Sequence, residues 1–359
     1  MAVGLTGGHI YPAVALAEQL GPQGQVLYVA RSRSLLAQLI LRDAGLPVVE
    51  LKVSALARDA RVLWEGPMFF WQQARAFYDC WRLLRDWQPH AVVGFGSYVA
   101  FPAVAAARLL GIPTLIYEPN AVYGLVNRIL APWVNVVAVT LGSWASSEKS
   151  LRVVQAPLRR ELRESLKLDV ARAREQLNID PQPPCLVIVG GSQGAVSLND
   201  AVCRAIDHLR QEKLDFTFVH VTGPAHEAAV RKFYEERDLL GSRGRCLAYG
   251  DAMGVIYRAA NLVVARAGAM TCLELIGFGR RALLVPLRGA GAHQLKNAQF
   301  LEQWGRAKIV PEQAFRTGAL EMALREELLS SDEASALSAP SSDLTLAEAL
   351  CDLLKKERL

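Results

Sequence analysis

The sequence lacks the patterns that mark several common protein classes. Its six cysteines are scattered, with no CxxC pair and no histidine pairing, so neither a disulfide framework nor a zinc site is indicated. No GxxxxGK[ST] segment is present, which argues against a P-loop ATPase. No GxGxxG loop with an acidic residue at the expected distance is present either, which disfavours a nicotinamide enzyme.

Long uninterrupted apolar runs are also missing. The uncharged stretch Ala91–Ala107 is broken by Gly94, Gly96 and Pro102, so it indicates a buried strand, a loop and a helix rather than a membrane span. No signal-peptide pattern precedes the first glycine-rich loop. We therefore expect a soluble chain in a reducing cytoplasm.

Charge is unevenly distributed over the 359 residues. Positions 1–160 carry 15 Lys and Arg against 9 Asp and Glu, whereas the remainder is nearly balanced. A positive N-terminal half suits a phosphate-bearing ligand or an anionic membrane surface, and the same count also fits an ordinary solvated surface.

Short apolar runs alternate with helical patterns along the chain. Strands are expected at 25–30, 47–53, 91–94, 113–117, 134–139, 151–154, 185–189, 216–221, 245–249, 261–265, 281–286 and 307–310. Helices are expected at 9–20, 33–44, 72–87, 98–110 and 123–131. This alternation predicts an α/β fold with two Rossmann-like, doubly wound parallel sheets. A hinge near 157–165 divides a domain at 1–160 from one at 161–340, and a C-terminal helix within 341–359 is predicted to cross back.

Two glycine-rich junctions carry most of the functional information. Gly4-Leu5-Thr6-Gly7-Gly8-His9 and Gly190-Gly191-Ser192-Gln193-Gly194-Ala195 each follow an apolar run and open a helical pattern. Such a junction leaves backbone N–H groups at a helix N-terminus, where the dipole attracts phosphate or diphosphate. One junction in each half predicts two domains with a site in a cleft between them.

Further polar residues follow the strands of the first half. His9 stands at a helix start, where the dipole favours its neutral form and suits a general base. The run Gly94–Tyr98 allows another close backbone approach at the carboxyl edge of the sheet. Glu118, Asn120 and Asn127 follow the next strand and belong either to that site or to a helix cap with exposed polar residues.

The second half has its own set of polar candidates. Arg266–Ala269 ends a strand, and Glu274 lies two helical turns further on, where a carboxylate could accept both ribose hydroxyls. Gln294 and Asn297 are three apart on one helix, so they point the same way. With Ser192 and Gln193, these residues outline a nucleotide-diphosphate site.

The segment Val62–Trp71 is unusually rich in large apolar side chains. It is flanked by arginines, and an exposed patch of this kind would insert into a lipid interface. A helix pair buried in the core is the alternative. The candidate membrane contacts are Leu63, Trp64, Phe69, Phe70 and Trp71, with Arg58, Arg61 and Arg75 around them.

In this order, the motifs resemble the MurG family of undecaprenyl-diphospho-muramoylpentapeptide N-acetylglucosaminyltransferases over almost the whole chain. The most specific segments are TGGHIYPAVALAEQL (6–20), GFGSYV, NAVYGLVNRILA (120–131), GGSQGAVSLN (190–199), RAGAMTCLE (266–274) and HQLKNA (293–298). The family implies a glycosyltransferase type B fold. Its donor, UDP-N-acetylglucosamine, binds the C-terminal domain, and a lipid-linked muramoyl pentapeptide binds the N-terminal domain.

The resemblance also implies roles for individual residues. The implied donor contacts are Thr6, Gly7, Gly8, His9, Asn120, Arg159, Ser192, Gln193, Gly194, Tyr249, Gly250, Met253, Arg266, Ala269, Glu274, Gln294 and Asn297. Gly96, Tyr98 and Asn127 match the acceptor cleft. The expected reaction inverts the sugar, with His9 as the first choice for the base and Glu118 as the second.

The family needs no metal and no cofactor, and the sequence has no Asp-x-Asp pair. The implied location is the cytoplasmic face of the cell membrane, as a peripheral protein on anionic lipids. Proteins of cell-wall synthesis and division are the implied protein partners, and no nucleic-acid partner is expected.

Several positions depart from the family pattern, most of them on the acceptor side or at the hinge. They are Leu5, Ser97, Tyr117, Pro119 and Ala156, together with Gly291 near the donor. Two alternatives therefore stay open: a related type B transferase with another acceptor, and a degenerate paralogue that binds UDP-sugar without turnover.

Overall fold

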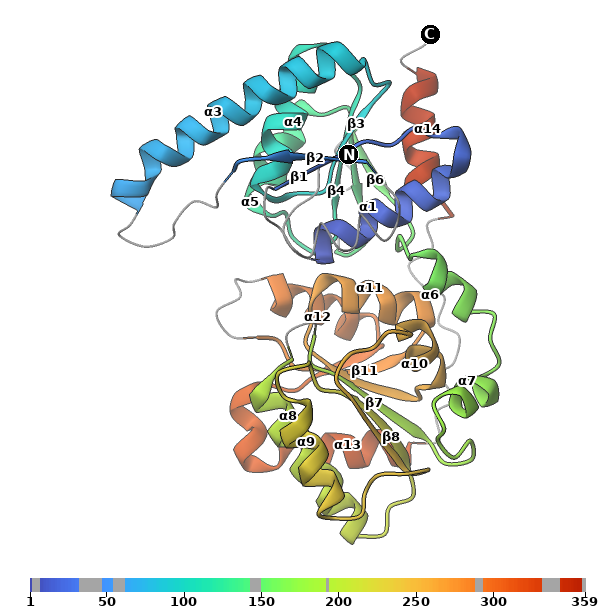
Figure 1. Cartoon of the computed structure of the whole chain (residues 1–359). Helices are drawn as coiled ribbons and strands as arrows, with labels where there is room; N and C mark the ends of the chain where they lie inside the picture. Colours follow the sequence, from blue (N-terminus) through green and yellow to red (C-terminus); the bar gives the residue numbers. More distant parts are fainter. Residues whose placement is uncertain are drawn as a thin grey trace. The chain divides into compact units, whose positions relative to one another are not determined.

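The structure is a computed structural model of the chain (Figure 1). It describes residues 1, 7–31, 47–53, 62–142, 150–191, 194–287, 293–330 and 343–356; within these ranges, the side chains of residues 7, 8, 23, 31 and 62–66 are not described. The chain divides into two compact units, Met1–Arg159 with Ser341–Leu359, and Arg160–Pro340.

All strands described in the first unit pair in parallel. One pair consists of β1 (Tyr28–Arg31) and β2 (Val48–Leu51). A four-stranded sheet has the order β3 (Val92–Gly94), β4 (Thr114–Glu118), β5 (Val136–Val139) and β6 (Leu151–Val153). Because the strands of each sheet run in parallel, they end at one edge of that sheet, where the loops that follow them begin.

Helices cover both faces of these strands, since neighbouring residues on a strand point to opposite sides. Val92, Ile116 and Val137 pack with one helical layer, and Val93, Leu115 and Val136 pack with the other. The first layer contains α3 (Val62–Trp87), α4 (Ser97–Leu109) and α5 (Leu125–Leu130), and η2 (Ala131–Trp133) follows α5. The second layer contains α1 (Gly7–Leu20) and α14 (Leu346–Lys356), and η1 (Gly21–Gln23) follows α1.

The second unit is built on one six-stranded parallel sheet, in the order β12-β11-β10-β7-β8-β9. The chain winds outward from β7 in one direction and from β10 in the other, so the switch point of this doubly wound sheet lies between those two strands. The strands are β7 (Cys185–Val189), β8 (Thr217–Val221), β9 (Gly244–Leu247), β10 (Leu262–Ala265), β11 (Arg281–Leu284) and β12 (Ala307–Ile309).

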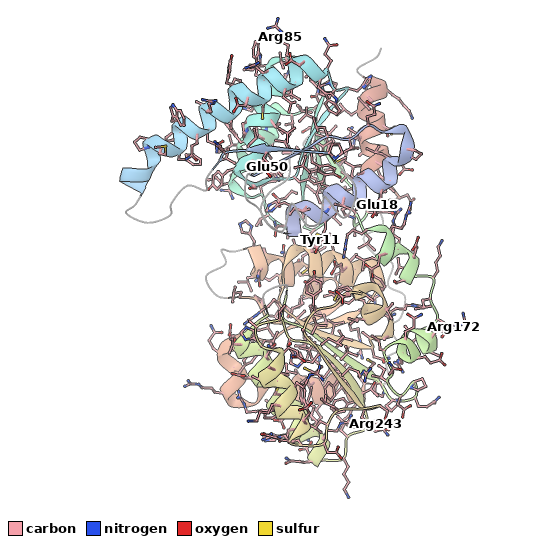
Figure 2. All side chains as sticks on the ribbon, in the orientation of Figure 1. Tyr11, Glu18, Glu50, Arg85, Arg172 and Arg243 are labelled. Carbon is pink, nitrogen blue, oxygen red and sulfur yellow. The ribbon has the colours of Figure 1, made fainter. Side chains whose placement is uncertain are left out.

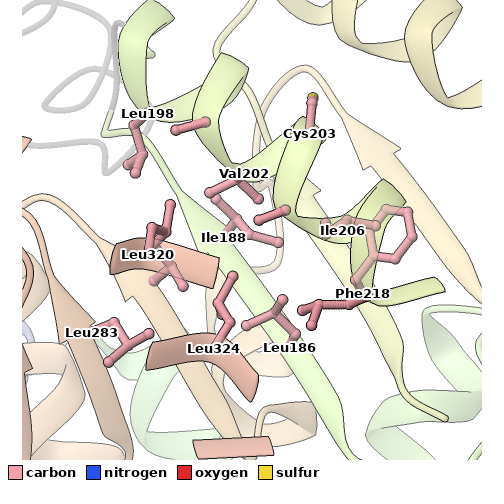
Figure 3. Packing of buried hydrophobic residues seen from close by; sticks show 14 of the residues in the cluster. Leu186, Ile188, Leu198, Val202, Cys203, Ile206, Phe218, Leu283, Leu320 and Leu324 are labelled. Atoms are coloured by element: carbon pink, nitrogen blue, oxygen red, sulfur yellow. The ribbon is translucent and has the colours of Figure 1, made fainter. Parts of the chain in front are cut away.

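The apolar core of the second unit fills one face of this sheet. Figure 3 shows Leu186 and Ile188 of β7 between helix residues such as Val202 and Leu324. This face is covered by α8 (Val196–Gln211), α9 (Glu227–Glu235) and α13 (Ala319–Leu329), with η3 (Glu312–Thr317) leading into α13. The remaining helices are α6 (Arg160–Ser165), α7 (Val170–Gln176), α10 (Met253–Ala259), α11 (Ala269–Phe278) and α12 (His293–Gln303).

The structure contains a strand at each of the twelve predicted positions. The helix expected at 33–44 lies outside the described residues. The segment 62–71 is neither a loop nor a separate helix pair, because α3 runs without a break from Val62 to Trp87 and includes Pro67. In the described part of the chain, no helix combines the length and the apolar character that crossing a bilayer requires.

Candidate functional site

Two helices begin without side-chain caps at the switch point of the second unit. Parallel pairing places Val189, the end of β7, opposite Ala265, the end of β10. The loops that follow lead into α8 and α11, whose N-cap residues are Ala195 and Gly268, so neither helix has a capping side chain. Their first N–H groups therefore lack the usual intrahelical or capping partner. Neighbouring helix N-termini of this kind form an anion-binding edge.

The first of these loops turns tightly because its glycines allow it. Gly194 has a φ of +75°, and a Cβ added there would lie 2.3 Å from the carbonyl oxygen of Thr222. Gly191 also has a positive φ, and its carbonyl accepts a hydrogen bond from the Gly194 amide at 2.9 Å. A side chain at position 194 would push the loop away from β8, so the glycine is required by contact as well as by conformation.

A buried polar chain supports that loop from within the core. Asn199 of α8 donates through Nδ2 to the Thr222 carbonyl at 3.0 Å, which turns its Oδ1 toward Nε2 of His220 at 3.2 Å. His220 Nε2 must then carry the proton, and Nδ1 accepts from the Tyr234 hydroxyl at 2.9 Å. A neutral imidazole fits this network, and burial lowers the pKa of His220 from 6.5 to about 3.

Arg266 follows β10 and is already paired within the protein. Its guanidinium makes two contacts with the Glu312 carboxylate, at 3.1 and 3.2 Å, and donates to the Ser197 hydroxyl at 3.0 Å. Ser197 and Glu312 also contact one another. Arg266 thus joins the strand end to the first turn of α8 and to η3. Its positive charge lies near the anion-binding edge, but it is neutralised by Glu312.

The remaining donor candidates of the second unit lie on α11 and α12 near the same edge. Ala269 is the first residue of α11. Burial raises the pKa of the Tyr257 phenol, and the charge of the nearby buried Glu274 raises it further. Gln294 accepts a hydrogen bond from the Leu287 amide at 2.9 Å. Asn297 is fully buried and donates to the Ala267 carbonyl at 3.2 Å, which fixes α12 to the start of α11.

The loop after β9 contributes a different kind of surface. Tyr249 is exposed, whereas Gly250 is buried and lies against Met253, the first residue of α10. A Cβ at position 250 would come within 2.3 Å of the Met253 sulfur. This close contact combines an aromatic ring, a thioether and backbone polar groups, a set that suits a planar base.

In the first unit, the carboxylate of Glu118 organises the carboxyl edge of the sheet. Oε1 accepts from the backbone and side-chain nitrogens of Asn120 at 3.0 and 2.8 Å. Oε2 accepts from the Gly124 amide and from Asn127 Nδ2, both at 2.9 Å. Glu118 is only 2% exposed, and four donors surround it. The alternative of a helix cap with exposed polar residues does not describe this arrangement, because Glu118 and Asn127 are buried and α5 begins at Gly124 without a side-chain cap.

His9 lies beside this cluster, across Gly96. A Cβ added to Gly96 would meet the His9 ring at 3.2 Å and Asn127 Nδ2 at 3.6 Å, so Gly96 allows both side chains to approach the backbone. The Asn127 Oδ1 is buried without a hydrogen-bond partner, which leaves an acceptor here. Enclosure by the protein lowers the pKa of His9 from 6.5 to about 4, so its imidazole is neutral at pH 7.

The backbone at Gly96 and Ser97 is left-handed, with φ of +79° and +69°. For serine this conformation is costly, and such strain is concentrated at functional sites. Tyr98 follows and makes an edge-to-face contact with Phe69 of α3, with ring centroids 5.4 Å apart. Arg159, predicted near the donor, stacks its guanidinium 4.2 Å from the centre of the Tyr11 ring, two residues after His9.

The predicted membrane segment is divided by its helical geometry. Phe70 and Trp71 are 67% and 61% exposed, whereas Phe69 is 9% exposed. The expectation that Phe69 faces outward is therefore wrong, because the helical turn directs it to Tyr98 and α4. Arg75 is exposed one turn after Trp71, and Figure 2 shows Arg85 projecting outward from the same helix.

Several predicted residues cannot be placed. Thr6, Ser192, Gln193, Arg58 and Arg61 lie outside the described residues, as do the side chains of Leu63 and Trp64. Gly7 and Gly8 are the first two residues of α1. Sequence reasoning missed His220, Asn199 and Glu312. The motif GGSQGAVSLN contains Asn199, but a histidine within an apolar strand gives no signal of its partners.

The fold and the carboxyl edges of its sheets define a class of protein. Two doubly wound parallel units, with uncapped helix N-termini at the switch point of one of them, are those of a type B glycosyltransferase. Residues 1–139 match the glycosyltransferase family 28 N-terminal domain, and residues 185–350 match the glycosyltransferase family 28 C-terminal domain.

Relatives narrow this class. An enzyme of Caldanaerobacter subterraneus is 32% identical over 319 residues, which cover 87% of this chain and 85% of the relative. One of Salinibacter ruber is 34% identical over 350 residues, which cover 96% and 91%. Both are named UDP-N-acetylglucosamine--N-acetylmuramyl-(pentapeptide) pyrophosphoryl-undecaprenol N-acetylglucosamine transferase. The crystal structure of Acinetobacter baumannii MurG matches with a TM-score of 0.75 and 28% identity, over 99% of this chain and 98% of that one. The chain belongs to the MurG family.

The buried histidine network generates a prediction about acid stability. Because the pKa of His220 is lower in the folded state, its stabilising contribution is complete above about pH 6.5 and decreases as the pH falls toward 3. In His220→Gln, the amide can still donate to Asn199 but does not titrate. We expect the free energy of unfolding of the wild type to fall more steeply below pH 6.5, by up to about 1.4 kcal/mol per pH unit, than that of the variant.

Urea unfolding of the full chain at pH 7.5, 6.0 and 5.0 measures this difference. His90→Gln, which changes an exposed histidine outside this network, is the control and should follow the wild type. An identical pH dependence for wild type and His220→Gln would contradict the assignment.

Proposed function

We propose that this chain transfers N-acetylglucosamine from UDP-N-acetylglucosamine to the C4 hydroxyl of undecaprenyl-diphospho-N-acetylmuramoyl pentapeptide, with inversion. The names of its relatives describe this donor and this acceptor. The observation that carries the proposal is the pair of uncapped helix N-termini, α8 and α11, on adjoining strands. Their N–H groups and dipoles suit the diphosphate that develops charge as the sugar leaves.

The second unit is proposed to hold the donor. The loop containing Gly194 receives the diphosphate, with Ser192 and Gln193 as further contacts, and Glu274 receives the ribose. Gln294 is proposed to contact the sugar, and the uracil to lie at Tyr249, Gly250 and Met253. Because Arg266 is paired with Glu312, we propose that it and Asn297 act by holding helix starts in position rather than by binding the donor directly.

The first unit is proposed to hold the acceptor at its carboxyl edge. His9 is the proposed base: a neutral imidazole can accept the C4 hydroxyl proton as the oxygen attacks the anomeric carbon. Glu118 already accepts four hydrogen bonds, so we propose that it positions Asn120 and Asn127 rather than acting as the base. Gly96 and Tyr98 would shape the same cleft.

UDP release tests the function directly. With UDP-N-acetylglucosamine and undecaprenyl-diphospho-muramoyl pentapeptide both present, we expect catalytic UDP release that is unchanged by a chelator. Omission of the acceptor should abolish the release. Donor binding without any turnover would favour a degenerate paralogue, and turnover with a different lipid acceptor alone would favour a related transferase.

His9→Gln tests the base. Loss of a general base should lower kcat by roughly 10²–10⁴-fold while the KM for the donor stays nearly constant. Because the pKa of His9 is lowered to about 4, kcat/KM of the wild type should stay level from pH 8 to pH 5.5 instead of falling around pH 6.5.

The matched control is His90→Gln, an exposed histidine in the same unit, which should keep full activity. Near-full turnover by His9→Gln, or a decline in wild-type kcat/KM centred on pH 6.5, would sink the assignment.

We further propose that the chain is peripheral to the cytoplasmic face of the membrane. Met68, Phe70 and Trp71 expose large apolar surfaces on α3, and the exposed Arg75, which pairs with Asp79 at 3.7 Å, follows one turn away. This combination suits insertion at headgroup level beside anionic lipids. Protein partners in cell-wall synthesis and division stay a prediction of the family resemblance.

Phe70→Ser combined with Trp71→Ser tests the membrane contact. Losing the apolar area of two side chains should weaken binding to phosphatidylglycerol vesicles at least about tenfold, while the affinity for UDP-N-acetylglucosamine stays the same. Cosedimentation measures the first quantity and calorimetry the second.

Met322→Ser combined with Leu329→Ser removes two comparably exposed apolar side chains from α13 and serves as the control. If both double variants bind vesicles as the wild type does, α3 is not the membrane contact.

A further inference from the structure

A cavity of about 320 Å³ lies in the second unit, away from the anion-binding edge at the switch point. It is lined by the last turn of α11, by Gly279 and Arg280 after it, and by Leu301, Trp304 and Arg306 at the end of α12. These residues immediately precede β11 and β12, so the cavity belongs to the amino edge of the sheet. Ala269, Gln294 and Asn297 lie at the starts of α11 and α12, toward the opposite edge, whereas Glu274 directly precedes Leu275 of the cavity lining. The cavity is therefore a separate feature of this unit.

The cavity carries positive charge, and none of the described residues that line it is acidic. Arg280 and Arg306 contribute two guanidinium groups, and Arg306 is only 7% exposed. Arg280 donates to the carbonyl of Arg258 at 3.1 Å, while its Nε is buried without a hydrogen-bond partner. Burial, and then the like charges of Arg258 and Arg174, lower the pKa of Arg280 to about 10. A buried donor without a partner is costly, so this geometry favours an external acceptor.

Within the described part of the chain, the hydrogen bonds of the neighbouring arginines go to carbonyl and amide oxygens rather than to carboxylates. Arg258 donates to the Leu168 carbonyl. Arg174 is buried and donates to the carbonyls of Ala259, Pro181 and Pro183 and to the Asn261 side chain. Carbonyl dipoles stabilise a guanidinium but do not cancel its charge. The cluster of Arg174, Arg258 and Arg280 thus keeps a net positive charge beside the cavity.

The other walls indicate what kind of anion fits. Ile276, Phe278, Leu301 and Trp304 form an apolar lining. A volume near 300 Å³ is at the lower end of small-molecule sites and exceeds the needs of a bare inorganic ion. The guanidinium of Arg280, with its unpartnered Nε, matches the charge and the acceptor geometry of a phosphate monoester. The indole of Trp304 offers a surface for an apolar or planar group.

We propose that this cavity, which we call the arginine pocket, is a binding site for a small organic phosphate, with Arg280 on the phosphate and Trp304 against its apolar body. The site is independent of the UDP-sugar site, and its occupation does not require transferase activity.

Phenyl phosphate is the test ligand, titrated calorimetrically into the full chain saturated with UDP, so that the diphosphate site is already filled. We expect saturable binding of one equivalent. Arg280→Gln should raise the Kd at least about tenfold, as loss of one charge-assisted contact implies. Trp304→Leu should weaken phenyl phosphate several-fold more than it weakens inorganic phosphate.

Arg281→Gln is the matched control. Arg281 is the next residue, but it pairs with Glu327 and does not line the pocket, and Lys308 still contacts Glu327 when Arg281 is lost. This variant should bind phenyl phosphate as the wild type does. Unchanged UDP affinity in each variant establishes that the unit is folded.

If phenyl phosphate shows no saturable binding with UDP present, the arginines serve only helix ends and carbonyl groups within the protein. That result would overturn the proposal. Equal affinities of wild type and Arg280→Gln would overturn it as well. Equal binding of inorganic phosphate and phenyl phosphate would overturn the organic nature of the ligand.

Discussion

The common direction of the strands is the constraint on which the rest of this molecule depends. Because the strands of each sheet run in parallel, each strand-to-helix loop within a unit opens at one edge. Helices that begin there leave N–H groups without intrahelical partners. At the start of α8 and α11, the N-cap residues Ala195 and Gly268 provide no side-chain cap for these groups. The backbone alone therefore creates a site for negative charge, before any particular side chain is considered.

Side chains then differentiate the two units. In the second unit, the buried network of His220, Asn199 and Thr222 fixes the loop at Gly194, and Arg266 with Glu312 fixes the start of α8. In the first unit, the buried carboxylate of Glu118 has a comparable organising role for the loop from Asn120 to Asn127. Neutral His9 lies next to that loop across Gly96. One unit thus presents N–H donors, and the other presents a weakly basic ring with amide groups.

Much of this fold was predictable because it depends on local patterns. Buried parallel strands are short apolar runs, and the glycine junctions mark where they end. The partners of charged side chains were not predictable in the same way. Arg266 and Glu312 are 46 positions apart, and His220 meets Asn199 across 21 positions, so only the folded chain brings them together. The prediction that Phe69 faces outward was wrong for a more local reason. Three consecutive aromatic residues on a helix cannot all face one side.

The position of α14 has a consequence for how the chain is made. The first unit is interrupted: α14 packs on α1 through Leu346, Leu350 and Leu353, after the whole second unit has been threaded between them. On a ribosome, α14 is synthesised only after Arg160–Pro340, which takes roughly 10 to 40 seconds at ordinary elongation rates. Until then, α1 lacks the helix that packs on it. During that interval the second unit can complete its core, while the part of α1 that α14 covers is not yet packed against that helix. Of the two units, the one that is synthesised first is therefore the last to be finished.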